Sequence, residues 1–306
     1  MNTGDFHGYP TYVLENEHLR LELLQEAGPR IVRLIPTGGP NLLAELPDVH
    51  LPSPYGPYTL YGGHRLWHAP EDPARTYVPD DDGVTVHATP NGARMFLPAD
   101  AHSHIAKIME VELLGDGSSS DRLHATGGIH LRHTLRNEGR WPVQLAAWAI
   151  TQLPTGGVAI LPQSNTPLDD AGLLPNRRLN LWPYTRLSDP RLAPQDDFIL
   201  IHGRADIAPR FKIGIMNRHR WAAHLGQGYL FCKFTDPQPQ QPHPDMGSNT
   251  EVYTDNRFLE LETLSPLRSL APGQELAHEE VWKIYPAPGV SSTAEEIRDY
   301  VLKAVR

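Results

Sequence analysis

The stretch NTEVYTDNRFLELETLSPLRSLAPGQELAHEEVWKIYP, residues 249–286, decides the fold. In FLELETL an extended chain sends Glu260 and Glu262 to one face and the intervening leucines to the other. Pro272 and Gly273 predict a turn, and ELAHEEVWKIY then continues as a second extended run, so we expect an antiparallel pair. Two carboxylates on one face suit acid–base chemistry on a polyol, although the same pattern also fits glutamates that face solvent.

Length and composition favour one large β domain over residues 1–306. The chain has 306 residues, 40% of them hydrophobic, which is enough for a substantial core. The 25 glycines and 30 prolines indicate many turns. Because the sequence shows no fixed-period repeat and no linker-like change of composition, we expect a single domain.

Net charge and the amino-terminal sequence limit the partners. The formal charge of −9 argues against nucleic acids and anionic membranes, which bind basic surfaces. The beginning of the chain lacks the apolar segment of a signal peptide, and no apolar run reaches the length of a membrane span. Cys232 is the only cysteine, so no intramolecular disulfide can form. These features predict a cytoplasmic protein.

Short alternating runs continue along the whole chain. The runs TYVLEN, HLRLELL and IVRLI, within residues 11–35, predict an antiparallel meander, and Gly115 to Ser120 predict a hairpin tip. Two segments, 46–82 and 162–196, are rich in proline and polar or aromatic residues, and we expect structured loops there, the first folded over a face of the sheet.

Helical signals are confined to the carboxyl end. Ser292 followed by Glu295 predicts a capping box, and an apolar stripe from Ile297 to Val305 follows it. The chain as a whole is therefore predicted to be an all-β protein of antiparallel strands with a C-terminal helix.

Three stretches together resemble the galactose mutarotase-like superfamily, which includes the aldose 1-epimerases. They are GGHRLW at 62–67, RNEGRWPVQLAAWAITQL at 136–153, and TEVYTDNRFLELETLSPLRSLAPGQE at 250–275. The sequence is most similar to an uncharacterised bacterial branch of this superfamily. The resemblance implies an antiparallel β-supersandwich and a small sugar as the ligand.

The resemblance also implies a chemistry, the interconversion of sugar anomers. A base removes the proton of the anomeric hydroxyl, an acid protonates the ring oxygen, and the opened sugar recloses after rotation. Matched to the family's motifs, Glu262 is the base and Arg65 the substrate-binding arginine. Where the aldose 1-epimerases carry a histidine acid, this chain has AAWAI, with Trp148 nearest to that position.

Other residues are therefore candidates for the acid and for sugar binding. We hypothesise that His64 or His68 supplies the acid and that Lys212 stabilises an oxyanion. Trp182 and Tyr184, in the second long loop, would stack on the apolar face of a pyranose, although ordinary packing explains them equally well.

A metal site is a weaker alternative. His64, His68 and Glu71 follow the spacing H-x3-H-x2-E, but Gly63 and Pro70 disfavour the continuous helix that would bring the two histidines together. A loop could still bring them together. We expect no metal and no cofactor.

The sequence is compatible with three functions. The first is an epimerase or mutarotase acting on a sugar, and the second is a carbohydrate-binding protein without catalysis. The third is a hydrolase or lyase that uses Glu251, Glu260 or Glu262, and in each case we expect Glu251 and Glu260 to contact the ligand. No feature of the sequence specifies an oligomeric state.

Overall fold

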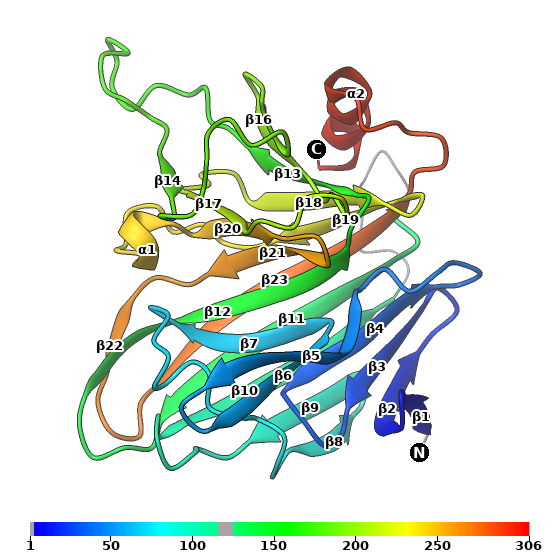
Figure 1. The fold of residues 1–306 in the computed structure, drawn as a ribbon, viewed down its shortest axis with the longest axis vertical. Coiled ribbons are helices and arrows are strands. Elements are labelled where there is room, and N and C mark those ends of the chain that lie inside the picture. Colours follow the sequence, from blue (N-terminus) through cyan, green and yellow to red (C-terminus); the bar gives the residue numbers. More distant parts are fainter. Residues whose placement is uncertain (1–2, 116–124, 306) are drawn as a thin grey trace.

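The protein consists of two large antiparallel sheets packed face to face, as the computed structural model shows for residues 3–115 and 125–305 (Figure 1). Within these residues every strand pairing is antiparallel, and the two helices are short. The all-β prediction is confirmed. Residues 116–120 of the predicted hairpin tip lie outside the described residues.

The first sheet carries the candidate site. In spatial order its strands are β1 (Thr3–Phe6), β2 (Tyr9–Glu15), β3 (Leu19–Leu24), β4 (Arg30–Pro36), β7 (His64–Ala69), β12 (Val143–Pro154), β21 (Phe258–Leu264), β20 (Thr250–Thr254), β17 (Phe211–Ile215) and β14 (Leu179–Leu181), and β22 (Arg268–Leu270) also pairs with β12. The predicted meander is confirmed, since β2, β3 and β4 pair consecutively.

The second sheet closes the other side of the sandwich. In spatial order its strands are β15 (Leu192–Pro194), β16 (Phe198–His202), β13 (Val158–Pro162), β18 (Trp221–Gly226), β19 (Tyr229–Phe234), β23 (Glu275–Pro286), β11 (Gly127–Asn137), β10 (Ile105–Leu114), β9 (Gly92–Leu97) and β8 (Thr85–Thr89). The remaining elements are the hairpin β5 (Glu45–Ser53) and β6 (Gly56–Gly62), and the helices α1 (Pro244–Gly247) and α2 (Ala294–Ala304).

The expected pairing of the two runs in residues 249–286 is wrong. β21 pairs with β12 and β20 in the first sheet, whereas β23 pairs with β11 and β19 in the second. The segment with Pro272 and Gly273 therefore carries the chain from one sheet to the other. The predicted alternation within β21 is confirmed, because Leu259 and Leu261 lie in the core between the sheets and Phe258 and Leu264 in a separate cluster on the outer face.

Residues 46–69 form strands, which corrects the prediction of an irregular loop. The hairpin β5–β6 nevertheless covers a face of the first sheet, since Tyr58 and Leu60 pack with Trp67 and Trp148 on its outer side. Pro47 and Pro52 concealed these strands from pattern reading; both lie in a two-stranded hairpin, where few backbone N–H groups are needed for pairing.

The turn between β6 and β7 requires two glycines. Gly62 and Gly63 have φ values of 89° and 70°, in the left-handed region that favours glycine. A Cβ atom on Gly62 would lie 2.0 Å from the carbonyl oxygen of Ala44, and one on Gly63 would lie 1.9 Å from that of Ile31. The chain can reverse here and begin β7 only because both side chains are absent.

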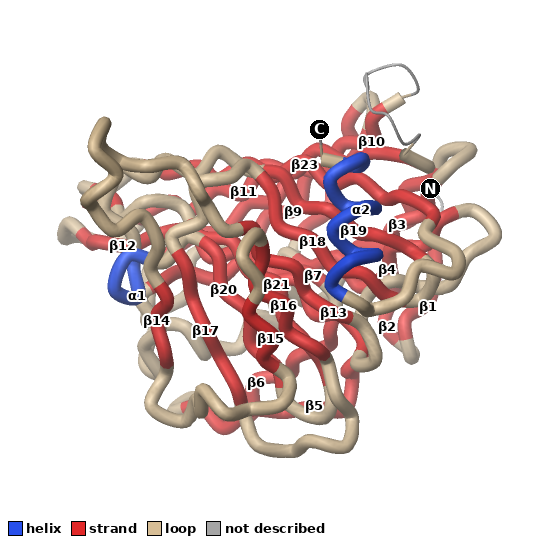
Figure 2. Tube along the Cα trace, turned by 90° about the horizontal axis from the view of Figure 1, so that it is seen from above, coloured by secondary structure: helices blue, strands red, loops and turns tan. Residues whose placement is uncertain are grey.

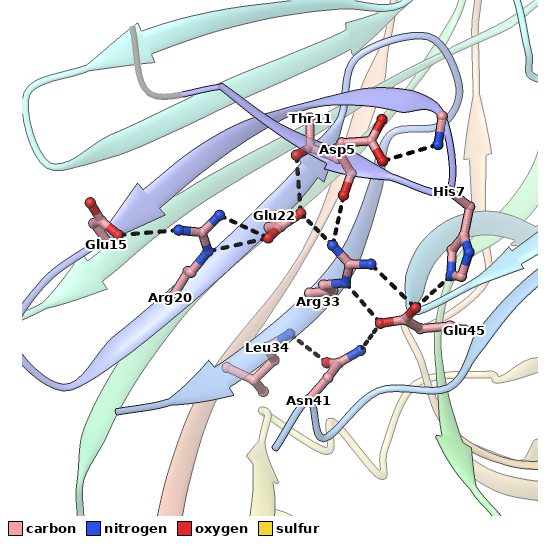
Figure 3. Close-up of polar contacts among 11 residues, drawn as sticks. Asp5, His7, Thr11, Glu15, Arg20, Glu22, Arg33, Leu34, Asn41 and Glu45 are labelled. Atoms are coloured by element: carbon pink, nitrogen blue, oxygen red, sulfur yellow. Dashed lines mark hydrogen bonds and ion pairs between the residues drawn. The ribbon is translucent and has the colours of Figure 1, made fainter. Parts of the chain in front are cut away.

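A polar network fixes the start of this hairpin to the first sheet (Figure 3). Arg33 on β4 bonds to Glu45 through Nε at 2.8 Å and to Glu22 on β3 through Nη1 at 3.0 Å. His7 and Asn41 also contact the Glu45 carboxylate. Glu45 is thereby held from three directions, which sets where β5 leaves the sheet.

Helix α2 packs against the second sheet through Ile297, Val301 and Ala304, as its apolar stripe predicts. The capping box is wrong by one residue, because the N-cap is Thr293 and Glu296 accepts the backbone N–H of Ser291. Among the described residues, no helix combines the length and apolar character needed to cross a bilayer.

Six histidines are buried among the described residues. Burial lowers the pKa of each of them, to about 3 for His68 and His278 and to about 4 for His224, and the other three are His64, His133 and His243. A buried histidine of lowered pKa stays neutral in the folded state, whereas the unfolded chain takes up protons near the ordinary value of 6.5.

Acid is therefore expected to destabilise the protein below pH 6.5. The free energy of unfolding should fall by about 1.4 kcal/mol per pH unit for each such histidine as the pH drops towards its folded pKa. Urea unfolding between pH 8 and pH 5 measures this slope. His68→Leu should make the slope shallower by about one proton, and the exposed His87→Asn should leave it unchanged; equal slopes in all three proteins would contradict the account.

Candidate functional site

Adjacent strands of the first sheet bring charged side chains together on its outer face. In the register of the sheet, Glu262 on β21 lies opposite Ile150 on β12 and Glu251 on β20. Glu260 lies opposite Tyr253, which in turn lies opposite Lys212 on β17. Because residues opposite each other share a face, the pairing itself collects these groups.

Lys212 is the centre of this cluster. Its ammonium lies 2.8 Å from Glu251 Oε2 and 2.9 Å from Glu262 Oε2. It also lies 4.6 Å and 4.7 Å from the ring centroids of Trp148 and Trp182, within range of cation–π attraction. Trp148 Nε1 donates to Glu262 Oε2 at 2.6 Å, so one carboxylate oxygen receives both donors.

The protonation states follow from burial and neighbouring charge. Burial opposes the charge on Lys212, but Glu251 and Glu262 outweigh it, so the pKa of Lys212 lies well above its ordinary value. Burial also raises the pKa of Glu251 well above its ordinary value; the charges of Glu262 and Asp245 add to this, while Lys212 opposes it. The group at neutral pH is therefore a charged ammonium beside one carboxyl group that holds its proton.

Glu260 is the second important carboxyl group. Arg65 Nη2 donates to its Oε1 at 2.9 Å, and Gln152 Nε2 donates to the same oxygen at 3.0 Å. Both bonds use Oε1, so Oε2 keeps its lone pairs for a ligand. Burial raises the pKa of Glu260 to about 7, with Arg65 opposing and Glu262 adding to the shift. A carboxyl group with this pKa can gain or lose a proton near neutrality.

These groups surround a cavity of about 240 Å³ between the sheet, the hairpin β5–β6 and the loop that follows β14. Its walls are largely aromatic and cationic, formed by Leu51, Leu60, Arg65, Trp67, Glu71, Tyr77, Trp148, Trp182, Tyr184, Arg210, Lys212, Tyr253, Arg257, Phe258 and Glu260. Glu251 and Glu262 are fully buried and do not line it. The cavity is below the roughly 300–1,000 Å³ typical of drug-sized ligands, and suits one sugar ring.

The structure brings together most of the residues singled out in the sequence. Arg65, Lys212, Glu260, Trp182 and Tyr184 line the cavity, and Glu251 and Glu262 lie directly behind Lys212.

His64 and His68 are not brought together with Glu262. Both alternate with Arg65 and Trp67 on β7, so they face the other sheet and not the cavity. His64 contacts Thr151 and His133 in the fully buried space between the sheets. The expectation that either histidine reaches the cluster from a loop is therefore corrected, since residues 64 and 68 belong to a strand.

Sequence reading missed other residues that line the cavity. Tyr253 lies two residues after Glu251 on the same strand and so shares its face, a signal that alternation alone contained. Arg210 stands two residues before Lys212, but just outside a strand, where alternation gives no information. Arg257 lies in a turn and pairs with Asp255 at 2.6 Å.

A second polar cluster lies between the sheets. His64, His133 and Glu280 place possible ligand atoms within 4.8 Å of one another, the only such group among the described residues. His68 and Glu71 are not part of it, so the metal set suggested by the sequence spacing is not assembled.

Existing hydrogen bonds already account for the ligand atoms of this cluster. His133 Nδ1 must donate to the carbonyl oxygen of His278, so its Nε2 accepts from His64 Nε2 at 2.8 Å. Glu280 is paired with Lys233 at 2.8 Å and accepts from Trp282 Nε1 at 2.9 Å. The charge of Glu280 is thus balanced by Lys233 without a metal cation, and we assign the cluster a structural role.

Removal of the Lys212 charge tests how the buried charges of the candidate site are balanced. Lys212→Met leaves two buried carboxyl groups without their cation, and we expect it to destabilise the fold by about 3–5 kcal/mol at pH 8. Glutamates that lose their cation have raised pKa values in the folded state. A carboxyl group whose pKa is raised in the folded state stabilises the fold only at low pH. The deficit relative to the wild type should therefore shrink as the pH falls to 5.

Urea unfolding of the single and double variants measures this balance. Adding Glu262→Gln to Lys212→Met should recover part of the lost stability, because it removes the unpaired charge of Glu262. A double variant whose loss equals the sum of the two single losses would contradict the assignment.

Comparison with known proteins identifies the fold. No protein-family model and no curated protein matches the sequence. A galactose mutarotase-like protein from Lactobacillus casei ATCC 334 is similar, with a TM-score of 0.54 at 10% identity over 90% of this chain and 100% of that chain. A putative mutarotase from Salmonella typhimurium gives a TM-score of 0.54 at 11% identity, covering 93% of each chain. A putative aldose 1-epimerase from Escherichia coli K12 gives 0.52 at 13% identity, over 90% of this chain and 99% of that one.

A larger protein contains the same fold as one part. A TPR-domain containing protein from Parabacteroides distasonis ATCC 8503 has a TM-score of 0.58 at 15% identity. The match covers 94% of this chain and 49% of that protein, so this chain spans about half of its length. At identities of 10–15% these likenesses concern the fold alone. They confirm the resemblance inferred from the three stretches: the chain has the galactose mutarotase-like β-supersandwich fold.

Proposed function

We propose that the protein binds a single sugar in this cavity and interconverts its anomers by acid–base catalysis of the mutarotase type. The observation that carries the proposal is the pairing of two unlike groups in one aromatic cavity. Glu260 has a pKa of about 7, raised chiefly by burial, and Lys212 is held as an ammonium by two carboxyl groups. The rings of Trp182 and Tyr184 offer flat surfaces for a pyranose.

Glu260 is assigned the proton exchange that the sequence prediction gave to Glu262. It lines the cavity, and both of its hydrogen bonds to described residues use Oε1, whereas Glu262 is buried behind Lys212 and Trp148. Glu262 would then be a positioning residue that keeps Lys212 charged and aimed. Arg65, which bonds to Glu260, orients the carboxylate and keeps further N–H groups for sugar hydroxyls.

In the proposed reaction Glu260 takes the proton of the anomeric hydroxyl as the bond between C1 and the ring oxygen breaks. The ring oxygen takes a proton from Lys212, whose third N–H is not used by Glu251 or Glu262. Glu251, 2.8 Å away and holding a proton, can restore the ammonium. Rotation about the C1–C2 bond and reversal of these transfers give the other anomer, so every proton is returned.

The test is polarimetry on freshly dissolved α-anomers of hexoses, pentoses and uronic acids. Glu260→Gln should lower the catalysed rate by about 10²- to 10⁴-fold, the usual contribution of a general acid–base group, while it keeps sugar binding. Glu279→Gln, on the exposed face of β23, is the matched control and should leave the rate unchanged. A Glu260→Gln protein with wild-type activity would rule out this assignment.

A carbohydrate-binding protein without catalysis is the second candidate. Two observations favour it: no histidine is among the described residues that line the cavity, and Trp148 stands where the aldose 1-epimerases carry their acid. Calorimetric titration separates the two. A sugar that binds the wild type, loses affinity in Trp182→Ala, and shows no faster mutarotation than in buffer would establish the binding function and exclude the catalytic one.

A further inference from the structure

A second cavity, lined by arginines, lies beside the candidate site at the edge of the first sheet. It measures about 620 Å³ and is formed where the loop before β14 meets the loop after β17 and the turn of α1. Figures 1 and 2 show α1 beside β14 at this edge. Arg177, Arg178 and Arg218 line it, together with His243, and none of the described residues that line it is acidic. We call it the arginine cleft.

The charges of these three arginines are not neutralised. None of them forms an ion pair with a carboxylate among the described residues, although the chain has a formal charge of −9. Arg178 donates to the carbonyl oxygen of Met246 at 2.7 Å, and Arg177 donates to that of Ser164 at 3.0 Å. Neighbouring guanidinium groups without counter-charges repel one another, and a bound anion would offset that repulsion.

Two buried polar atoms of the cleft also lack partners. Arg218 Nε is buried and makes no hydrogen bond to any described residue, and the same is true of Nε2 of His243, a residue only 7% exposed. His243 Nδ1 lies 3.0 Å from the carbonyl oxygen of Gln241 and must donate to it. In the neutral ring Nε2 then carries a lone pair and can only accept. A water molecule, an ion or a ligand commonly supplies the partner of such an atom.

We infer that the arginine cleft binds a phosphate group. Guanidinium groups match phosphate oxygens in geometry and charge. His243 supplies the acceptor that a phosphate bearing a hydroxyl requires, and burial lowers the pKa of His243, so the ring is neutral at pH 7.5. The cleft is separate from the sugar cavity, and this inference does not depend on the proposed function.

Isothermal titration calorimetry at pH 7.5 and constant ionic strength tests the site with inorganic phosphate and sulfate. We expect saturable binding of phosphate and binding of sulfate at least 10-fold weaker, since sulfate has no proton to donate to His243. Arg218→Gln should weaken phosphate binding at least 10-fold. Arg220→Gln is the control, because Arg220 is exposed, pairs with Asp236 and lies outside the cleft, and it should bind as the wild type does.

Two further measurements test the role of His243 and the source of the phosphate. His243→Phe should reduce the preference for phosphate over sulfate to nearly one, with folding checked by its urea midpoint. Glucose 6-phosphate, whose second pKa is about 6, has lost at pH 7.5 the proton that His243 would accept, so it should bind more weakly than inorganic phosphate, which supports the free ion. Tighter binding of glucose 6-phosphate would contradict the role of His243 and indicate a phosphorylated metabolite. Absence of saturable phosphate binding, equal binding by Arg218→Gln, or binding of glucuronate alone would overturn the inference.

Discussion

The ammonium of Lys212, held between Glu251 and Glu262, is the interaction on which the outer face of the first sheet depends. Its three members come from β17, β20 and β21, so one charge contact links three neighbouring strands. A shift of one residue in any of these strands would turn its charged side chain into the apolar space between the sheets. Because an unpaired charge there costs several kcal/mol, the cluster specifies the register of the sheet as well as a chemical site.

The charged cluster lies beside the apolar residues that the outer face buries beneath the hairpin β5–β6. The hairpin β5–β6 and the aromatic rings of Trp67 and Trp148 shield the charges from water, and the surrounding low polarity strengthens each contact. The same shielding raises the pKa of Glu260 to about 7. Burial of charge beneath aromatic rings thus creates the need for charge pairing and also shifts the pKa of Glu260 towards neutrality.

The sequence predicted the local properties of the strands well and their long-range pairing poorly. Alternation in residues 258–264 correctly separated Glu260 and Glu262 from the core leucines, because a side chain's face depends only on its own strand. The partner of that strand depends on residues more than a hundred positions away in β12. The turn at Pro272 and Gly273 resembles a hairpin turn, yet it joins two sheets, and no local signal distinguishes the two cases.

The candidate site shows the same limit of prediction from local sequence. Treating GGHRLW as a loop allowed His64 and Arg65 to be placed in one site, whereas adjacent residues of a strand must face opposite ways. Alternation alone did not distinguish Glu260 from Glu262, and the family resemblance assigned the base to Glu262. Only the packing of Lys212 and Trp148 over Glu262 decides which of them meets the cavity.

The backbone conformation of the turn at α1 could not be predicted from the sequence composition. Asp245 and Met246 adopt φ values of 49° and 58°, a left-handed conformation that costs non-glycine residues roughly 1–2 kcal/mol each. Asn180 Nδ2 donates to the carbonyl oxygen of Asp245 at 2.9 Å, and Arg178 donates to that of Met246. Strained backbone persists only where its surroundings fix it. Here those surroundings include the arginine cleft on one side and the charge of Asp245, felt by Glu251, on the other. The turn therefore lines the arginine cleft and also places a charge near Glu251, one of the two carboxyl groups behind Lys212.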